Sequence, residues 1–407
     1  MARSKKKSEE KETKKIELKQ DKNLDKFEDD LAKYLEKEAG VEVAGLSEKN
    51  FVPYLIDTGN YALNWICSHD FFGGLPGTKA ILLEGENSKG KSLLGAKLLG
   101  ENIIGGGSSW YFDTEDAANY NFVSQIVGSK EVAAKIKRID QVHTIEQLNK
   151  AMSQMINFQI AKGSDNAKRV MALVDSYSQL SSEKEVKAAE KAYDPKKEDA
   201  RDMTKAQKSR EGLRAITSKF FAANMTPIYI AHVTKNIGVM FGDPNVPATH
   251  GSMLLYTVSL RLSLTSSKDI QDPKYPIPIG VRLRIRTVKN RSVHKGKTCE
   301  LDLYFKDGVD RFSGLVKLLR DYKIVECSAD PTPTSKVKYD DFEFPYRDVS
   351  KVVASFKEKG RDLLNEWNEK LRDIVEFREA SIPEEEYLKS EDDIEDVIPE
   401  EIFNEEG

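Results

Sequence analysis

A glycine-rich segment in the first quarter of the chain has the pattern of a phosphate-binding loop. Residues 85–92 fit GxxxxGK[ST], with an apolar run at residues 80–83 before them and a helical pattern at residues 93–99 after them. In such a loop, backbone N–H groups and a helix N-terminus face the phosphates, the lysine reaches the β- and γ-phosphates, and the hydroxyl binds Mg²⁺. The predicted contacts are Gly85, Glu86, Asn87, Ser88, Lys89, Gly90, Lys91 and Ser92, with Ser92 as a metal ligand. The alternative is an ordinary glycine-rich turn.

Two further apolar runs end in acidic residues. Residues 170–174 precede Asp175, and residues 110–112 precede Asp113 and Glu115. A phosphate loop needs a carboxylate on a neighbouring strand to orient the metal, which predicts Asp175 as the second metal ligand; capping of the next helix is the alternative. Hydrolysis needs a group that orients or deprotonates water, so we predict Glu115 as the general base and Asp113 as a structural acid. Because side chains alternate along a strand, both acids are expected to project in the same direction.

These groups need a sheet to bring them together. Between residues 51 and about 319, apolar runs alternate with helical segments, which is typical of a buried, largely parallel α/β sheet. The runs at 260–264 and 281–285 alternate apolar and polar residues, so we expect a peripheral antiparallel extension with one solvated face. Apolar residues at helical spacing predict an amphipathic helix at 24–35 and a small helical region that contains residues 363–375.

Composition limits the classes of protein that fit. Of 407 residues, 39% are hydrophobic and 32% charged, which is slightly polar for a globular enzyme and indicates solvated ends. No apolar run reaches the roughly 18 to 20 residues of a membrane span, and no apolar signal segment follows the lysine-rich start, so we expect a cytoplasmic protein without membrane contact. The three cysteines and five histidines lack metal-ligand spacing, so structural zinc is not expected.

The spacing of the motifs resembles the RecA family of DNA strand-exchange recombinases over about residues 57–325. Walker motifs occur in very many NTPases, but residues 237–244 are similar to the second DNA-binding loop of bacterial RecA and are quite specific. The other matching segments are 57–64, 73–76, 112–117, 173–176 and 288–291. Dispersed insertions and the histidine at position 232 look more like phage UvsX-type recombinases. The resemblance implies an α/β fold: a RecA-type P-loop NTPase core with a mostly parallel central sheet, an N-terminal helical oligomerisation element and a small helical C-terminal region.

The resemblance implies roles for residues around a bound ATP. Glu115 activates the hydrolytic water, and His232 occupies the γ-phosphate sensor position, where bacterial RecA has glutamine. A histidine can donate a hydrogen bond to phosphate; the alternative is a core or capping histidine. Asn119 and Phe122 stand where the family has an aspartate and a tyrosine at the adenine, and an aromatic face can still stack on a base.

The resemblance also implies a pair of cations that act between subunits. Lys289 and Arg291 correspond to the pair that reaches across the filament interface to the neighbouring subunit's phosphates, so hydrolysis would depend on assembly. The family pattern has lysine at both positions, and a planar guanidinium at Arg291 changes the geometry. Without the resemblance, both residues are interpreted as a solvated basic strand edge.

Two loops are expected to bind DNA. The segment 233–252 would be the second DNA-binding loop, in which Ile237 wedges between bases while glycine lets the backbone approach closely. We assign to it Lys235, Ile237, Gly238, Met240 and Phe241. Met240 and Phe241 are alternatively buried anchors.

The segment 179–208 would be the first DNA-binding loop, and it is longer and more charged than the family pattern. Lys205, Lys208 and Arg210 are its candidates for phosphate contacts. The alternative is a solvated charged face.

Four regions are predicted along the chain. They are a basic N-terminal arm with an oligomerisation helix (1–50), a RecA-like ATPase core with two DNA-binding loops (51–329), a small helical region (330–382) and an acidic disordered tail (383–407). The helix is expected to pack on the next subunit, and such a heterologous contact need not close, which yields a helical filament.

The predicted function is homologous recombination and DNA repair. We expect a DNA-dependent ATPase that uses ATP and Mg²⁺, releases ADP and phosphate, forms helical filaments on single-stranded DNA and exchanges strands with homologous duplex DNA. A single-strand-binding protein or a mediator is a further expected partner, and the location is the host cytoplasm if a phage encodes the protein. The alternatives are another RecA-fold ATPase, such as a hexameric helicase, and a non-catalytic recombination mediator.

Overall fold

The computed structural model describes residues 22–40, 43, 52–116, 118–163, 166–190, 204–235, 245–249, 252–272, 274 and 276–379. The chain divides into two compact units, Met1–Phe51 and Val52–Gly407. The first contains α1 (Lys22–Ala39), which confirms the predicted amphipathic helix, and its apolar residues Phe27, Leu31 and Leu35 are exposed. The basic arm, most of the following residues up to 51 and the acidic tail lie outside the described residues.

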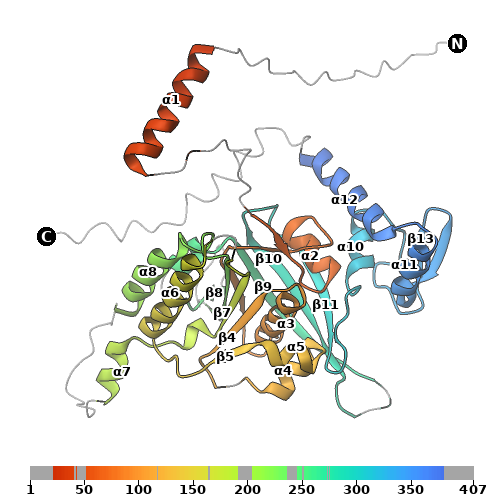
Figure 1. Cartoon of the computed structure of the whole chain (residues 1–407). Helices are drawn as coiled ribbons and strands as arrows, with labels where there is room; N and C mark the ends of the chain where they lie inside the picture. Colours follow the sequence, from red (N-terminus) through yellow and green to blue (C-terminus); the bar gives the residue numbers. More distant parts are fainter. Residues whose placement is uncertain are drawn as a thin grey trace. The chain divides into compact units, whose positions relative to one another are not determined.

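The second unit has the predicted α/β architecture (Figure 1). Its strands are β1 (Leu55–Ile56), β2 (Leu75–Pro76), β3 (Ile81–Gly85), β4 (Ser108–Asp113), β5 (Lys137–Ile139), β6 (Val170–Asp175), β7 (Met225–Lys235), β8 (Asn245–Pro247), β9 (Leu260–Ile270), β10 (Gly280–Asn290), β11 (Thr298–Tyr304), β12 (Gly308–Val309), β13 (Lys336–Tyr339) and β14 (Phe342–Pro345). Its α-helices are α2 (Tyr61–Ser68), α3 (Lys91–Ile104), α4 (Tyr120–Val127), α5 (Lys130–Lys135), α6 (Ile145–Ala161), α7 (Glu183–Glu190), α8 (Thr204–Thr217), α9 (Met253–Thr257), α10 (Leu315–Asp321), α11 (Val349–Glu358) and α12 (Leu363–Glu379). None of the helices described is long and apolar enough to cross a membrane.

One large sheet organises the second unit. Its strand order is β12-β11-β10-β9-β3-β7-β6-β4-β5, with β8 paired to β7. The pairs from β9 through β3, β7, β6 and β4 to β5 are parallel, whereas β9 to β12 pair antiparallel. The predicted parallel sheet and antiparallel extension are therefore confirmed. Strand β9 belongs to both parts, because it runs parallel to β3 and antiparallel to β10.

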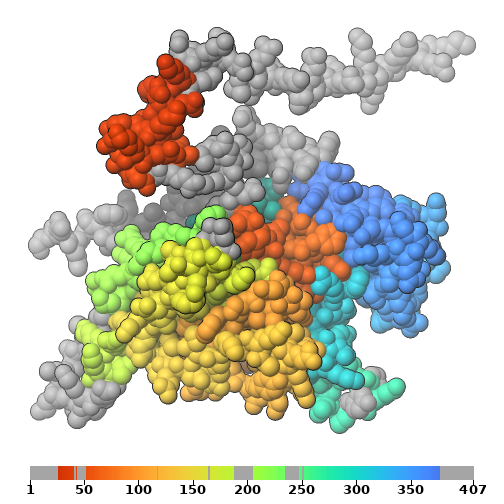
Figure 2. All heavy atoms as spheres, in the orientation of Figure 1, coloured from red at the N-terminus to blue at the C-terminus, as the bar shows by residue number. Residues whose placement is uncertain are grey.

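The core lies on both faces of this sheet. All residues of β3 and β6 are buried, which explains why residues 81–83 and 170–174 are continuous apolar runs rather than alternating ones. Ile81 and Leu83 join a cluster with residues of α2, α3 and α10, whereas Leu82 joins residues of α6 and α8 on the other face. The segments of α6 and α8 also lie side by side in the space-filling view (Figure 2).

The C-terminal region is only partly helical. Helices α11 and α12 match the prediction, but a hairpin of β13 and β14 precedes them. Its sequence alternates charged and apolar residues on either side of Asp340, whose φ of 47° lies in the left-handed region of a tight turn. The hairpin therefore departs from the predicted helical region, because two four-residue strands give only a short period-two pattern. Buried Val337 and Trp367 belong to the same cluster as the sheet core, so this region shares the core of the second unit.

The two predicted long loops contain regular structure. Helix α7 and the first residues of α8 lie within 179–208, and the end of β7 and strand β8 lie within 233–252. These described parts are helix and strand where the sequence analysis expects loops, because charged helices and short strands give weak apolar periodicity.

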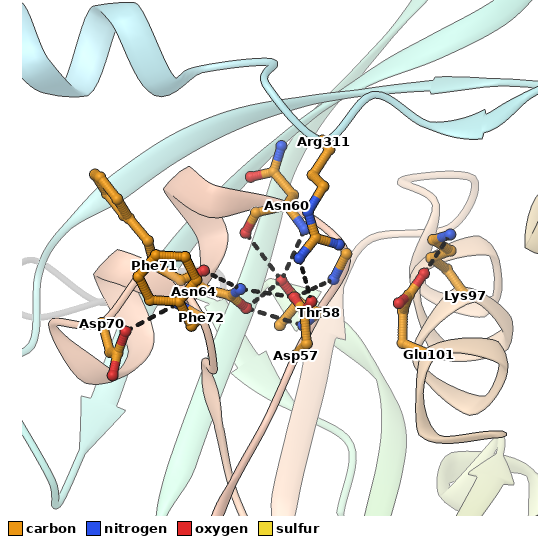
Figure 3. A network of polar contacts seen from close by, with 11 residues as sticks. Asp57, Thr58, Asn60, Asn64, Asp70, Phe71, Phe72, Lys97, Glu101 and Arg311 are labelled. Atoms are coloured by element: carbon orange, nitrogen blue, oxygen red, sulfur yellow. Dashed lines mark hydrogen bonds and ion pairs between the residues drawn. The ribbon is translucent and has the colours of Figure 1, made fainter. Parts of the chain in front are cut away.

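A hydrogen-bonded network joins the start of the second unit to the end of the sheet (Figure 3). Asn64 accepts from the backbone N and hydroxyl of Thr58, at 2.9 and 2.7 Å, and donates to Asp57 and to a backbone carbonyl, both at 2.7 Å. Asp57 also pairs with Arg311, and the Asn60 side chain donates to two backbone carbonyls in the segment around Arg311. The polar residues in 57–64 therefore brace α2 against the segment that follows β12.

Candidate nucleotide-binding site

The strand, loop and helix predicted for the phosphate-binding pattern are all present. Strand β3 ends at Gly85 and α3 begins at Lys91. Gly90 has a φ of 86°, and a Cβ there would lie 2.5 Å from the Leu283 side chain. A Cβ on Gly85 would lie 2.7 Å from the carbonyl oxygen of Leu264. Both glycines of the motif are therefore required, because the backbone passes close to the antiparallel extension.

Lys91 lies against the loop that precedes it. Its Nζ donates to the carbonyl oxygens of Gly85, at 2.9 Å, and Glu86, at 2.7 Å. Burial lowers the pKa of Lys91, while the carboxylates of Asp175 and Glu115 oppose that shift. The ammonium group is thus held by neutral carbonyls at the N-terminus of α3, a position that favours the approach of an anion.

Asp175 and Ser92, the two predicted metal ligands, lie next to each other. The Asp175 carboxylate accepts a 2.6 Å hydrogen bond from the Tyr111 hydroxyl, and it also accepts one from the Ser92 hydroxyl. Burial raises the pKa of Asp175, and these two hydroxyl donors partly offset the rise. The carboxylate therefore faces the loop rather than capping the next helix. A carboxylate oxygen beside a hydroxyl oxygen is a donor set that fits Mg²⁺.

Glu115 and His232 lie together opposite the loop. The Glu115 carboxylate accepts a 2.7 Å hydrogen bond from the Ser176 hydroxyl, and its Oε1 is 3.4 Å from Nε2 of His232. The His232 backbone N–H donates to the Ser178 hydroxyl at 2.9 Å, and Nδ1 of His232 is buried with no hydrogen-bond partner among the described residues. This histidine therefore stands at the cleft, within reach of the predicted base, rather than in the apolar core.

Asp113 and Glu115 do not share the orientation that strand alternation predicts. Asp113 accepts from the backbone N–H of Ala118 at 2.8 Å and pairs with Arg138 at 3.0 Å, which confirms its structural role. Strand β4 ends at Asp113, and the bend that follows contains Asp116 with a φ of 53°. The period-two rule therefore stops before Glu115, which contacts a different set of groups.

A cleft of about 900 Å³ joins most of these side chains. The predicted residues that line it are Asn87, Ser88, Gly90, Lys91, Ser92, Glu115, Phe122, Asp175 and His232. Ser267 and Asp269 of β9 and Val281 of β10 also line it and are not predicted from the sequence, because strand register rather than a local motif brings this hairpin beside the loop. The loop and the acids Glu115 and Asp175 line the same cleft, and Phe122 provides an exposed ring there.

Other residues assigned to nucleotide binding do not line this cleft. Gly85 and Glu86 supply the carbonyls that hold Lys91, and Lys89 pairs with Glu86 at 3.7 Å. The side chain of Asn119 caps α4 by accepting from two backbone N–H groups, including that of Asn121 at 2.9 Å. Helix capping explains an asparagine at that position without a ligand.

Lys289 and Arg291 lie at the edge of the sheet formed by the amino ends of the parallel strands. The phosphate loop lies at the opposite edge, where the carboxyl ends of these strands meet. Asn290 pairs with Leu260, and Leu260 pairs with Ile81, which is the first residue of β3, whereas the phosphate loop follows the last. Four residues of strand separate the two edges by roughly 13 Å along β3. The prediction that these cations do not serve their own subunit's loop therefore agrees with the strand register.

Backbone carbonyls at the end of α9 hold these two cations. Lys289 Nζ donates to the carbonyls of Leu255, at 2.8 Å, and Tyr256, at 3.1 Å, and the Arg291 guanidinium donates to the Tyr256 carbonyl at 2.9 Å. Burial, together with the charges of Arg291 and Arg261, lowers the pKa of Lys289 to about 8. The two cations therefore lie close together, and the partners described for them are backbone carbonyls rather than a carboxylate.

The sequence of this chain is similar to those of known proteins. A family model described as RecA N-terminal domain matches residues 23–310, which is most of the chain. The chain belongs to the RecA family. Protein RecA of Corynebacterium urealyticum is 25% identical over 363 residues, which is 87% of each chain. Protein RecA of Malacoplasma penetrans is 26% identical over 298 residues, 73% of this chain and 82% of its own, and that of Rickettsia prowazekii is 25% identical over 284 residues, 70% and 76%.

The DNA-binding residues expected for a RecA-family protein fall mostly outside the described part. Ile237, Gly238, Met240, Phe241 and the Lys235 side chain lie outside the described residues. Arg210 is described, and it is exposed on α8. Beside it, Lys208 pairs with Glu211 at 2.9 Å, and Lys205 pairs with Glu185 at 3.7 Å. Arg210 therefore stays a predicted DNA contact on a helix with paired charges.

Proposed function

We propose that this protein is an ATP- and Mg²⁺-dependent recombinase that forms helical filaments on single-stranded DNA and catalyses homologous pairing and strand exchange. Membership of the RecA family supports the class of activity. The observation that carries the proposal is the position of His232. It lies 3.4 Å from Glu115 at the cleft, on β7, and β7 runs directly into the segment predicted to bind DNA. A nucleotide contact at His232 is therefore communicated along a few residues of strand to the DNA-binding segment.

Each residue of the cleft has a separate role in the proposed hydrolysis of ATP. The loop N–H groups and Lys91 bind the phosphates, and Ser92 and Asp175 hold Mg²⁺, which offsets phosphate charge when bound. Glu115, oriented by Ser176, positions the attacking water and accepts its proton. His232 donates a hydrogen bond to the γ-phosphate. Phe122 stacks on the base.

Assembly completes the site. Lys289 and Arg291 are too far from their own loop, so they act on the nucleotide of the adjoining protomer, in the manner of an arginine finger. The exposed apolar stripe of α1 packs on a neighbouring subunit, and this heterologous contact repeats into a helix. In a ring-forming ATPase the same head-to-tail contact between subunits closes. The shape of the assembly, an open helix or a closed ring, therefore separates the recombinase from a hexameric motor.

Binding of DNA is assigned to two segments. Residues 233–252 contact bases and the DNA backbone through Lys235 and Ile237, and Arg210 near the first segment contacts phosphate. Stretched single-stranded DNA opens gaps between bases that an apolar side chain fills. Homologous duplex DNA pairs with this strand, and base pairing supplies the specificity. A single-strand-binding protein or a mediator assists loading.

Within the family, we place the protein beside phage UvsX-type recombinases, because a histidine stands at the sensor position. We assign residues 51–329 to the ATPase core, 330–382 to an accessory region and 383–407 to an acidic tail. The short N-terminal region 1–50 serves assembly.

Electron microscopy tests the proposal. Purified protein is mixed with long single-stranded DNA, Mg²⁺ and a non-hydrolysable ATP analogue, and a matched sample lacks nucleotide. We expect continuous, extended helical filaments only with nucleotide. Closed rings would favour a hexameric motor, and filaments that bind DNA but exchange no strands in the following assay would favour a mediator.

A further inference from the structure

A buried tyrosine contacts the predicted metal ligand from the neighbouring strand. The hydroxyl of Tyr111 donates a 2.6 Å hydrogen bond to Oδ2 of Asp175. The Tyr111 side chain is 5% exposed, and Asp175 is 6% exposed. Tyr111 does not line the cleft that contains Asp175, Ser92 and Lys91, so it acts on any ligand there only through Asp175.

The register of the sheet explains why these two residues meet. Strands β4 and β6 are parallel neighbours, in which Tyr111 pairs with Leu173 and Asp113 pairs with Asp175. Tyr111 and Leu173 both belong to the cluster on the α3 face, and Asp175, two residues beyond Leu173, projects toward the same face. Tyr111 is therefore the diagonal neighbour of Asp175, and a long aromatic side chain can span that distance.

The contact leaves Asp175 with one oxygen committed to the protein. A carboxylate at the end of a strand rotates about two side-chain bonds, and a donor fixed in the core restricts that rotation. The Ser92 hydroxyl is the other side-chain donor to this carboxylate. A phenol donates a hydrogen bond without carrying positive charge, so Asp175 keeps its full negative charge for a cation.

We propose that Tyr111 is a positioning residue for metal binding, which holds the Asp175 carboxylate in the orientation that meets a divalent cation beside Ser92. The inference rests on the proposed Mg²⁺ and ATP site and adds a residue that the motifs do not contain. Removal of the phenol oxygen frees the carboxylate to rotate, and this loss of orientation weakens cation binding because the cation must then fix the carboxylate itself.

The test measures cation binding directly, with Mn²⁺ as the paramagnetic probe. The full chain is saturated with a non-hydrolysable ATP analogue, and free Mn²⁺ is followed by electron paramagnetic resonance during titration. For Tyr111→Phe we expect the dissociation constant for Mn²⁺ to rise about tenfold, the size of effect typical of a lost hydrogen bond to a charged group. Nucleotide affinity measured with a chelator and no divalent cation should stay within about twofold of that of the original protein.

A matched control is available on the other face of the same sheet. The Tyr229 hydroxyl is buried with no hydrogen-bond partner among the described residues, so Tyr229→Phe removes the same atom without removing a contact. We expect unchanged Mn²⁺ binding for that variant, and circular dichroism checks that both variants fold. Equal or tighter Mn²⁺ binding by Tyr111→Phe would overturn the inference. Failure of the original protein to bind Mn²⁺ with nucleotide would instead overturn the proposed site itself.

Discussion

The two edges of the central sheet, at the carboxyl and the amino ends of its parallel strands, differ in what their charged side chains contact. At the edge where β3 and β6 end, the acidic groups contact other side chains: Glu115 contacts Ser176 and His232, and Asp175 contacts Tyr111. Lys91 lies beside them and donates to carbonyls of its own loop. At the other edge, Lys289 and Arg291 meet only the carbonyls of α9 among the contacts described for their cationic groups.

The difference indicates which edge is complete within one subunit. The first edge brings the loop, Asp175 and Glu115 together in one cleft, so a single subunit supplies the groups proposed to bind the nucleotide and its metal. The second edge holds two close cations whose described contacts are backbone carbonyls, and burial, together with the charges of Arg291 and Arg261, lowers the pKa of Lys289. A phosphate from another protomer would supply the missing negative charge.

The largest effect is expected from Lys91→Ala, which should disable the first edge. Loss of the ammonium group removes a charge-assisted contact to phosphate, so we expect nucleotide affinity to fall about a hundredfold or more. A fluorescent ATP analogue measures it by titration. Lys89→Ala is the matched control, because Lys89 belongs to the same loop but pairs with Glu86 and does not line the cleft. Unchanged affinity in Lys91→Ala would contradict the assignment of the loop.

Lys289→Ala should separate the two edges. Nucleotide affinity of the free protomer should remain unchanged, whereas ATP turnover on single-stranded DNA should fall on the order of a hundredfold, because a cation acting in trans is lost. The exposed Lys295, in the turn after β10, provides the control variant Lys295→Ala. A loss of affinity in the free protomer would place Lys289 at its own nucleotide and erase the distinction between the edges.

Asn64→Ala should weaken the brace beneath the second edge. Asn64 makes four hydrogen bonds within the network of Figure 3, and α2, which it braces, is tied to β10 by a 2.9 Å bond from Asn290 to the Cys67 carbonyl. We expect the free energy of unfolding to fall by about 2 to 4 kcal/mol, because several buried groups lose partners. Urea denaturation measures this, with the exposed Asn121→Ala as the control. A loss no larger than that of the control would show that the network contributes little.

A smaller effect should appear as pH rises through the pKa of Lys289, about 8 in the free protomer. The neutral amine binds phosphate poorly, so filament-dependent turnover should fall several-fold between about pH 7.5 and 9. Stability moves the other way: between pH 8 and 10.5 the unfolded chain binds more protons than the folded one at this lysine, so its contribution to the free energy of unfolding rises with pH. Lys289→Arg should flatten the turnover profile, and an equally steep profile in that variant would assign the titration to another group.

Local pattern was sufficient to predict the first edge. The loop at 85–92 and the acid at Asp175 lie next to strands whose apolar runs are unmistakable, and all are in the predicted places. Tyr111 could not be found in this way, because its contact with Asp175 depends on which strands are neighbours and in what register. The same holds for Asp113 and Glu115, whose shared direction failed where β4 ends.

The second edge was visible only through resemblance. Without the resemblance, Lys289 and Arg291 are interpreted as a solvated strand edge. Their position in the sheet depends on the antiparallel direction of β10, which the local sequence does not reveal. The hairpin of β13 and β14 was missed for a related reason, because short alternating segments carry little signal when tertiary packing decides their state.

A mixture of two defective variants tests the division between edges most directly. Glu115→Gln disables a protomer's own cleft, and Lys289→Ala disables what it supplies to its neighbour. On single-stranded DNA each variant alone should hydrolyse ATP poorly, whereas an equal mixture should recover roughly one quarter of normal turnover, because half of the clefts are intact and half of their neighbours carry Lys289. No gain on mixing would contradict the account, since Lys289 would then act within its own subunit or not at all.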